Sequence, residues 1–186
     1  MMLRLVAILL FLAANMPQGI AQKAQPTECT IRAVIEIPAG TLQKWEINKK
    51  TGIIEHQRMN ADSLRMINYL PYPANYGFVP NTLMSKSEGG DGDPLDIFVI
   101  GEAVERGTEI ECRPIAIIKL TDNNERDDKV IAVALDSPLR SVRNLHDLRT
   151  KYKGIIEILS LWLQHYDTDS VHILSIEDYT FPPKEM

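Results

Sequence analysis

The segment E-G-G-D-G-D-P-L-D-I-F-V-I, which runs from Glu88 to Ile100, joins an acidic turn directly to an apolar strand. It places Asp91, Asp93 and Asp96 within six residues, and four apolar residues follow without interruption. Gly, Asp and Pro favour turns, whereas Val, Ile and Phe favour strands. Because carboxylates that are this crowded repel one another, the segment predicts a loop that binds a cation or a charged substrate beside a buried strand.

Other segments on both sides of this one also predict strands. They are rich in Val and Ile, and turn-forming residues separate them. They comprise residues 31–37, 43–47, 53–54, 96–100, 109–119, 129–135 and 171–176. Short strands separated by such turns predict a closed or nearly closed β-barrel.

One helix is predicted near the C-terminus. Its apolar residues recur at intervals of four and three positions, which places them on one face of a helix. These residues are Leu148, Tyr152, Ile155, Leu159, Trp162 and Tyr166. We expect this helix to cover one side of the barrel, and core packing alone could account for Tyr166.

The N-terminal segment has the pattern of a cleavable secretory signal peptide. Arg4 precedes an unbroken apolar run from Leu5 to Ala14, and the helix breaker Pro17 follows. Such a run is too short to span a bilayer as a helix. We therefore expect a signal peptide at residues 1–21, an exported (periplasmic or extracellular) domain at 22–186 and no stable membrane anchor. A buried N-terminal helix is the alternative.

The charge balance argues against nucleic acid as a partner. The chain has 20 Lys and Arg against 25 Asp and Glu, a formal net charge of −5, and removal of the signal peptide takes away only Arg4. Nucleic-acid binding depends on clustered Lys and Arg that release counterions from the phosphate backbone.

The chain has two cysteines, Cys29 and Cys112. In an exported protein they could form a disulfide that closes a long loop. Whether they do depends on the distance between their Cα atoms, so a pair of free thiols stays an alternative.

A calcium-binding EF-hand does not explain the acidic segment. Counted from Asp91, such a loop requires an oxygen ligand at its position five and Gly at its position six. This sequence has Leu95 and Asp96 there. A solvated acidic turn is the remaining alternative. A second acidic loop, from Thr121 to Lys129, lies between two predicted strands and argues for a shared site.

Charged residues upstream extend this pattern. Lys44 and Glu46 are two positions apart, so both project from one side of a strand. Glu36 lies within an apolar strand, where an unpaired charge is unfavourable. Arg58 and Tyr76 add a fixed cation and a phenol. Carboxylates for several metal ions, interleaved with these groups, predict a site for a small and highly charged phosphate compound.

Six motifs, taken in order, resemble those of family I soluble inorganic pyrophosphatases. They are V-I-E-I-P at 34–38, K-W-E-I at 44–47, Y-P-A-N-Y-G at 72–77, D-G-D-P-L-D at 91–96, C-R-P at 112–114 and T-D-x4-D-x-K at 121–129. The resemblance implies a mainly β (α+β) fold, an OB-like five-stranded closed β-barrel flanked by a C-terminal α-helix. It also implies hydrolysis of pyrophosphate to two phosphates with several Mg²⁺ ions per site, other divalent ions being alternatives, in a homo-oligomer.

The resemblance also implies roles for individual residues. Asp93 would accept the proton of the nucleophilic water, with Lys44, Arg58 and Tyr76 as further catalytic residues. The phosphate-binding set would be Lys44, Arg58, Tyr76, Lys129 and Tyr166. The metal-binding set would be Asp91, Asp96, Asp122, Asp127, Glu36 and Glu46. Asp128 is expected at the surface, and Arg113 is interpreted as a member of a structural ion pair.

The sequence departs from the family pattern directly after the helix tyrosine, where Asp167 stands in place of the usual lysine. An anion there should weaken phosphate binding, so restoring lysine should tighten it. The loop at 84–90 is also longer than usual, and no second C-terminal helix is expected. Two alternatives therefore stay open: a non-catalytic secreted metal- or phosphate-binding relative of the same fold, and an enzyme that hydrolyses a larger diphosphate such as a nucleotide.

Overall fold

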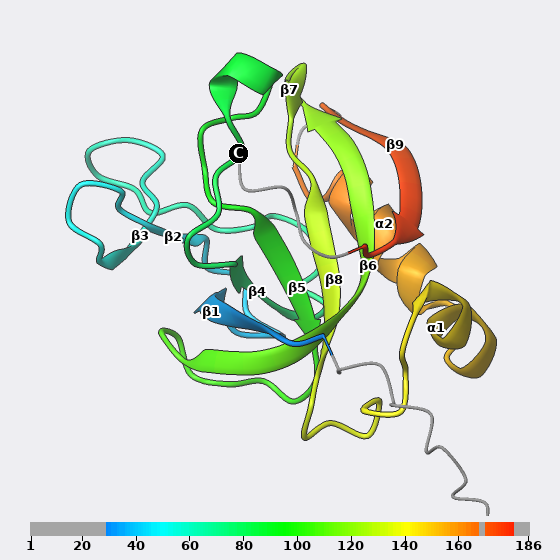
Figure 1. Ribbon diagram of the computed structural model, residues 1–186. Coiled ribbons are helices and arrows are strands. Elements are labelled where there is room, and N and C mark those ends of the chain that lie inside the picture. Colours follow the sequence, from blue (N-terminus) through cyan, green and yellow to red (C-terminus); the bar gives the residue numbers. More distant parts are fainter. Residues whose placement is uncertain (1–28, 168–169, 181–186) are drawn as a thin grey trace, which may run out of the picture.

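The computed structural model describes residues 29–167 and 170–180 (Figure 1), and the predicted signal peptide at 1–21 lies outside the described residues. The described strands are β1 (Ile31–Ile37), β2 (Trp45–Ile47), β3 (Ile54–His56), β4 (Asn75–Phe78), β5 (Asp96–Ile100), β6 (Glu109–Asp122), β7 (Glu125–Arg126), β8 (Lys129–Ala134) and β9 (Val171–Asp178). The described helices are α1 (Leu145–Lys151), α2 (Ile155–His165) and the single 3₁₀ turn Lys86–Glu88.

Five of these strands close into a ring. The order is β1, β4, β5, β8 and β6, and β6 pairs with β1 to complete the circle. The pair β5–β8 is parallel, and the other pairs in the ring are antiparallel. The long strand β6 also pairs with β7 and β9, while β2 and β3 form a separate hairpin. The predicted mainly β, OB-like five-stranded closed barrel is confirmed.

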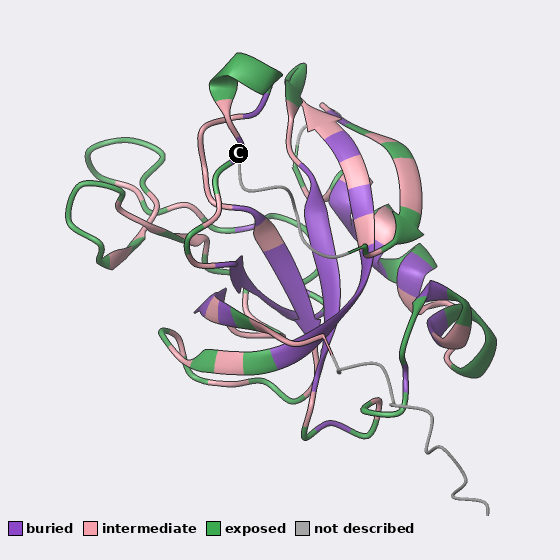
Figure 2. Ribbon diagram, viewed as in Figure 1, coloured by how far each residue is buried: buried purple, intermediate pink, exposed green. Residues whose placement is uncertain are grey.

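The adjacent strands β5 and β8 are buried on both faces along most of their length, which explains their nearly continuous apolar sequences (Figure 2). Along β5 and β8, Phe98 and Ile131 belong to the cluster that contains Trp162 of α2. The alternating residues Ile97 and Val130 belong to a second cluster on the opposite side of the strands. Because successive side chains of a strand point to opposite faces, one set packs under α2 and the other fills the barrel.

The helical region differs from the prediction in one respect. The single helix expected between Leu148 and Tyr166 is two helices, because the chain turns at Gly154, where φ is +89°. Gly adopts this left-handed conformation without the steric cost that a Cβ atom brings. The predicted apolar face is nevertheless correct, since Leu159 and Trp162 are buried against the barrel.

Neither helix within residues 29–167 and 170–180 has the length and apolar content that crossing a bilayer requires.

The motif Y-P-A-N-Y-G fixes the barrel wall below the acidic loops. The buried Asn75 side chain accepts hydrogen bonds from the backbone N–H groups of Ala39 and Val104, both at 3.2 Å. At Gly77, a Cβ atom would lie 1.8 Å from the carbonyl oxygen of Val34. Only glycine permits β1 and β4 to approach this closely, so the motif's Asn and Gly serve the fold.

Both cysteines are free thiols. Cys112 lies in β6 opposite Ile31 of β1 and is buried, and its thiol donates to the Ile31 carbonyl oxygen at 3.5 Å. Burial, with a contribution from the Glu111 charge, raises the pKa of Cys112 to about 12. The Cys112 thiol is therefore protonated and unreactive near neutral pH.

Candidate active site

The two acidic loops lie side by side. Asp96, the first residue of β5, pairs with Lys129, the first residue of the parallel strand β8. Beyond these strands, Gly90 forms a bridge with Arg126, and the Arg126 N–H donates to the Gly89 carbonyl at 2.7 Å. Figure 1 shows the 3₁₀ turn of the first loop next to β7. Strand pairing thus brings together carboxylates that are about thirty residues apart in sequence.

Lys129 is the centre of this arrangement. Its side chain is 5% exposed, and its Nζ lies 2.5 Å from Asp96 Oδ2 and 2.5 Å from Asp127 Oδ1. These two oxygens are therefore at most about 5 Å apart. Burial lowers the pKa of Lys129, but the charges of Asp96 and Asp127 outweigh that effect and raise it. Lys129 is consequently a permanent cation that holds the two loops together.

Negative charge is concentrated around this lysine. Burial raises the pKa of Asp91, and the charge of Asp96 raises it further against the opposing effect of Lys129. Burial likewise raises the pKa of Asp127, where Lys129 opposes the effect and Asp96 adds to it. Burial and mutual repulsion disfavour the ionised form of these carboxylates. A cation that binds among them therefore stabilises that form.

Tyr76 connects the acidic loops to the aromatic core. Its hydroxyl donates a hydrogen bond to Asp96, and its ring lies 4.8 Å from the Phe98 ring and 5.3 Å from the Tyr72 ring. Burial, followed by the Asp96 charge, raises the pKa of Tyr76 well above its usual value. The phenol therefore stays protonated and can act only as a donor toward the carboxylate. Lys44 Nζ lies 5.2 Å from the Tyr76 ring centroid.

Glu36 projects from β1 toward the same region. It is 5% exposed, and its Oε1 accepts a hydrogen bond of 2.6 Å from the Ile47 N–H at the end of β2. Burial raises the pKa of Glu36 to about 7, and the Asp96 charge contributes in the same direction. An ionised Glu36 therefore costs the folded protein free energy at neutral pH.

We predict that Glu36→Gln stabilises the metal-free protein at high pH. The folded-state pKa lies above the unfolded value of about 4.5, so ionisation of Glu36 destabilises the fold progressively as the pH rises through that range. The amide can still accept from Ile47, and it carries no charge. Urea denaturation should show a gain of up to about 3 kcal/mol at pH 8 that vanishes below about pH 4.5. An equal gain at pH 4 and pH 8 would contradict this assignment.

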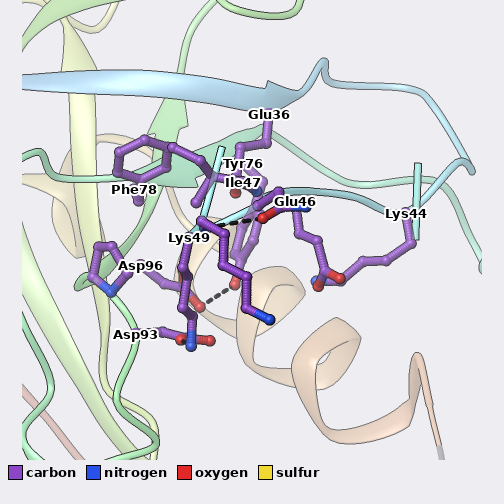
Figure 3. A pocket seen from close by; sticks show the side chains of 12 residues that line it. Glu36, Lys44, Glu46, Ile47, Lys49, Tyr76, Phe78, Asp93 and Asp96 are labelled. Carbon is purple, nitrogen blue, oxygen red and sulfur yellow. Dashed lines mark hydrogen bonds and ion pairs between the residues drawn. The ribbon is translucent and has the colours of Figure 1, made fainter. Parts of the chain in front are cut away.

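A pocket of about 470 Å³ opens between the hairpin β2–β3 and the first acidic loop (Figure 3). Asp93 and Asp96 lie toward one side of it, and Lys44 and Glu46 lie toward the other. The predicted site residues that line it are Glu36, Lys44, Glu46, Tyr76, Asp93 and Asp96. The pocket thus combines anionic and cationic side chains, as a site for a metal-bound polyanion requires.

Six predicted residues lie outside the lining of this pocket. They are Asp91, Asp127 and Lys129, whose surroundings are given above, and Arg58, Asp122 and Tyr166. Arg58 is exposed after β3, and its Nη1 donates to the Ala61 carbonyl at 2.9 Å. Asp122, the last residue of β6, accepts a hydrogen bond from Ser170 Oγ at 2.6 Å. Tyr166 stacks on Trp162 with ring centroids 4.4 Å apart, in agreement with a packing role.

The expectation that Asp128 lies at the surface is wrong. Its side chain is 1% exposed and pairs with Arg126, whose Nη2 lies 2.6 Å from Asp128 Oδ2. The N–H of Leu120 also donates to Asp128 at 3.3 Å. Asp128 therefore stabilises the turn that presents Asp127. Arg113 donates to the carbonyl oxygens of residues 140 and 142, which is a structural role, and the expected ion pair is not among these contacts.

Two cations near the site were not predicted. Lys49, in the turn after β2, lines the pocket and forms an ion pair with Asp93 across it. Arg65, in the loop after β3, forms an ion pair with Asp167. The signal for Lys49 is its place two positions after the end of the K-W-E-I motif. Arg65 gives no comparable signal, because its partner is 102 positions away.

Comparison with known proteins agrees with this geometry. The family model described as inorganic pyrophosphatase matches residues 33–180. The inorganic pyrophosphatase of Saccharolobus solfataricus is 37% identical over 145 residues, which cover 77% of each chain. The soluble inorganic pyrophosphatase of Oryza sativa subsp. indica is 38% identical over 117 residues, 62% of this chain, and the chain spans about half (49%) of that relative's length.

A solved structure has the same fold. The crystal structure of type I inorganic pyrophosphatase from Toxoplasma gondii superposes with a TM-score of 0.77 at 24% identity, covering 85% of this chain and 76% of the other. That likeness establishes the fold, and the family model adds the sequence pattern over the whole barrel. The chain belongs to the inorganic pyrophosphatase family.

Proposed function

We propose that this chain hydrolyses inorganic pyrophosphate to two phosphates with the help of Mg²⁺. The observation that carries the proposal is the contact of Asp96 and Asp127, from separate loops, with the same buried Lys129 beside a pocket of mixed charge. Family membership supports the same reaction.

The chemistry of the donor set suits divalent cations. Within the described part of the chain, no three His, Cys, Asp or Glu side chains are arranged so that they could hold a metal ion. The Lys129 ammonium lies between Asp96 and Asp127. The carboxylates nevertheless supply the oxygen ligands that Mg²⁺ prefers. We assign Asp91, Asp96, Asp127 and Asp122 to the metals, with Glu36 and Glu46 holding metal-bound waters. When bound, Mg²⁺ would neutralise phosphoryl oxygens and lower the pKa of a water molecule.

The chain's own residues would bind the anion and move the proton. Lys44, which lines the pocket, and Lys129, which contacts the pocket-lining Asp96, would attract the phosphoryl oxygens. Asp93 accepts a proton from the attacking water as the water oxygen bonds to phosphorus. The bond between that phosphorus and the bridging oxygen breaks, and its electron pair leaves with the second phosphate.

A substrate panel tests this proposal against both alternatives. We expect phosphate release from pyrophosphate with Mg²⁺, loss of release with a chelator, and much slower release from nucleoside diphosphates and triphosphates. A colorimetric phosphate assay on the purified chain measures all three. Equal rates with nucleotides would favour the larger-diphosphate enzyme. Calorimetric binding of pyrophosphate without phosphate release would favour the non-catalytic relative.

We further propose that the protein is exported after removal of residues 1–21 and that it assembles as a homo-oligomer. The sequence pattern of residues 1–21 supports export. N-terminal sequencing of the protein recovered from its producing cells should begin at or near residue 22. Recovery of the uncleaved chain from the cytoplasm would contradict export, and light scattering would give the oligomeric state.

A further inference from the structure

Arg65 is held next to Lys44 by the backbone. The backbone N–H of Lys44 donates to the Arg65 carbonyl oxygen at 3.1 Å. The Arg65 N–H donates to the Gln57 carbonyl oxygen at 2.7 Å, and the Gln57 N–H donates to the Lys44 carbonyl oxygen at 2.9 Å. The neighbouring bridge between Gln43 and Met66 is antiparallel, so Lys44 and Arg65 are directly opposite each other. Opposed residues of an antiparallel pair project from the same face, and two like charges there repel.

Side-chain contacts extend this arrangement from the pocket to the end of α2. Glu46, which lines the pocket, accepts from Gln57 Nε2 at 2.9 Å. The Oε1 of the same Gln57 accepts from Arg65 Nη1 at 2.8 Å. Arg65 Nη2 forms an ion pair with Asp167. Asp167 thus orients a guanidinium that is already connected to the pocket wall.

Arg65 also acts electrostatically on Tyr72, an aromatic residue next to the site. Burial and the Asp96 charge raise the pKa of Tyr72, and the Arg65 charge lowers it again. The Tyr72 ring lies 5.3 Å from the ring of Tyr76, whose hydroxyl contacts Asp96. The Arg65 side chain is 28% exposed, so a solute can reach it. A guanidinium has five N–H donors, more than these two contacts use.

We infer that Arg65 binds a phosphate of the substrate at the edge of the pocket and that Asp167 is the residue that positions it. The inference rests on the proposed hydrolysis of pyrophosphate. This inference reverses the expectation drawn from sequence alone, in which Asp167 weakens phosphate binding. Asp167 instead supports phosphate binding, because its ion pair keeps the Arg65 guanidinium close to Lys44. A lysine at position 167 would repel Arg65 and remove that support.

The test is the split between KM and kcat for pyrophosphate. We expect Arg65→Ala to raise KM about tenfold, since one charge-assisted hydrogen bond contributes on that order. Asp167→Asn should raise KM about threefold to tenfold, and Asp167→Lys should raise it rather than lower it. Asp167→Glu should restore most of the affinity, and Arg65→Lys only part of it. Arg149→Ala, an exposed arginine on α1, is the matched control and should leave both constants unchanged.

Two results would overturn the inference: an unchanged KM in Arg65→Ala, or a lowered KM in Asp167→Lys. If Arg65→Ala does not fold, as urea denaturation would show, Arg65→Lys and Asp167→Asn decide by the same criterion. If the wild type binds pyrophosphate without turnover, the proposed function fails separately. Calorimetric affinity for pyrophosphate with Mg²⁺ then replaces KM, and equal affinity in wild type and Arg65→Ala overturns the inference.

Discussion

Asp93→Asn should lower kcat for pyrophosphate by about 10²–10⁴, the range in which a general base contributes. The Asp93 side chain lines the pocket, and its backbone N–H donates to Asp91 Oδ1 at 2.8 Å, a contact that the substitution leaves in place. An amide at this position keeps the shape of the side chain but cannot take the proton of the attacking water. Steady-state phosphate release at saturating Mg²⁺ measures the effect.

Asp136→Asn is the matched control for this prediction. Asp136 is exposed in the turn after β8, and its replacement makes the same change in net charge at a distance from the pocket. We expect its kcat to equal that of the wild type. If Asp93→Asn retains a kcat within threefold of the wild type, Asp93 is not the base.

Lys129→Met should lower the free energy of unfolding by about 3–5 kcal/mol, the usual effect of removing one member of a buried ion pair. The substitution fills a similar volume, but it leaves Asp96 and Asp127 next to each other without their shared cation. The repulsion falls on the contact between β5 and β8, which is part of the barrel ring. Urea denaturation in metal-free buffer measures the loss.

A surface lysine provides the comparison. Lys151 pairs with Asp147 at 3.0 Å on α1, and its side chain is 48% exposed. Lys151→Met should therefore cost less than about 1 kcal/mol. The double variant Lys129→Met with Asp127→Asn should recover part of the loss, because one of the two unpaired charges is gone. A loss below 1 kcal/mol for Lys129→Met alone would show that the ammonium does not hold the loops together.

Four of the five barrel strands were predictable from the sequence because their signals are local, whereas β4 (Asn75–Phe78) was not among the predicted strands. The strands β1 and β5 have the predicted bounds, since each is an apolar run that ends at a turn-forming residue, Pro38 or Gly101. The break between α1 and α2 was not predicted. The apolar period continues across Gly154, and a single Gly inside a helical pattern costs only about 1 kcal/mol, so periodicity does not reveal the turn.

The carboxylates of the site were predictable as a group, but their partners were not. Motif spacing identified Asp91, Asp96 and Asp127, and strand pairing brings their loops together. The pairing of Arg65 with Asp167 depends on how a loop meets the end of α2, and no periodicity in the sequence encodes that contact. The burial of Asp128 was also missed.

We propose that the two acidic loops form one site that cleaves a diphosphate. Phosphorus NMR of pyrophosphate mixed with Mg²⁺ and the purified chain tests it most directly. We expect the pyrophosphate signal to be replaced by a single inorganic phosphate signal, with two phosphates formed for each pyrophosphate consumed. When the metal is chelated, the pyrophosphate signal should stay unchanged. A pyrophosphate signal that persists unchanged with Mg²⁺ and folded wild-type protein would contradict the account.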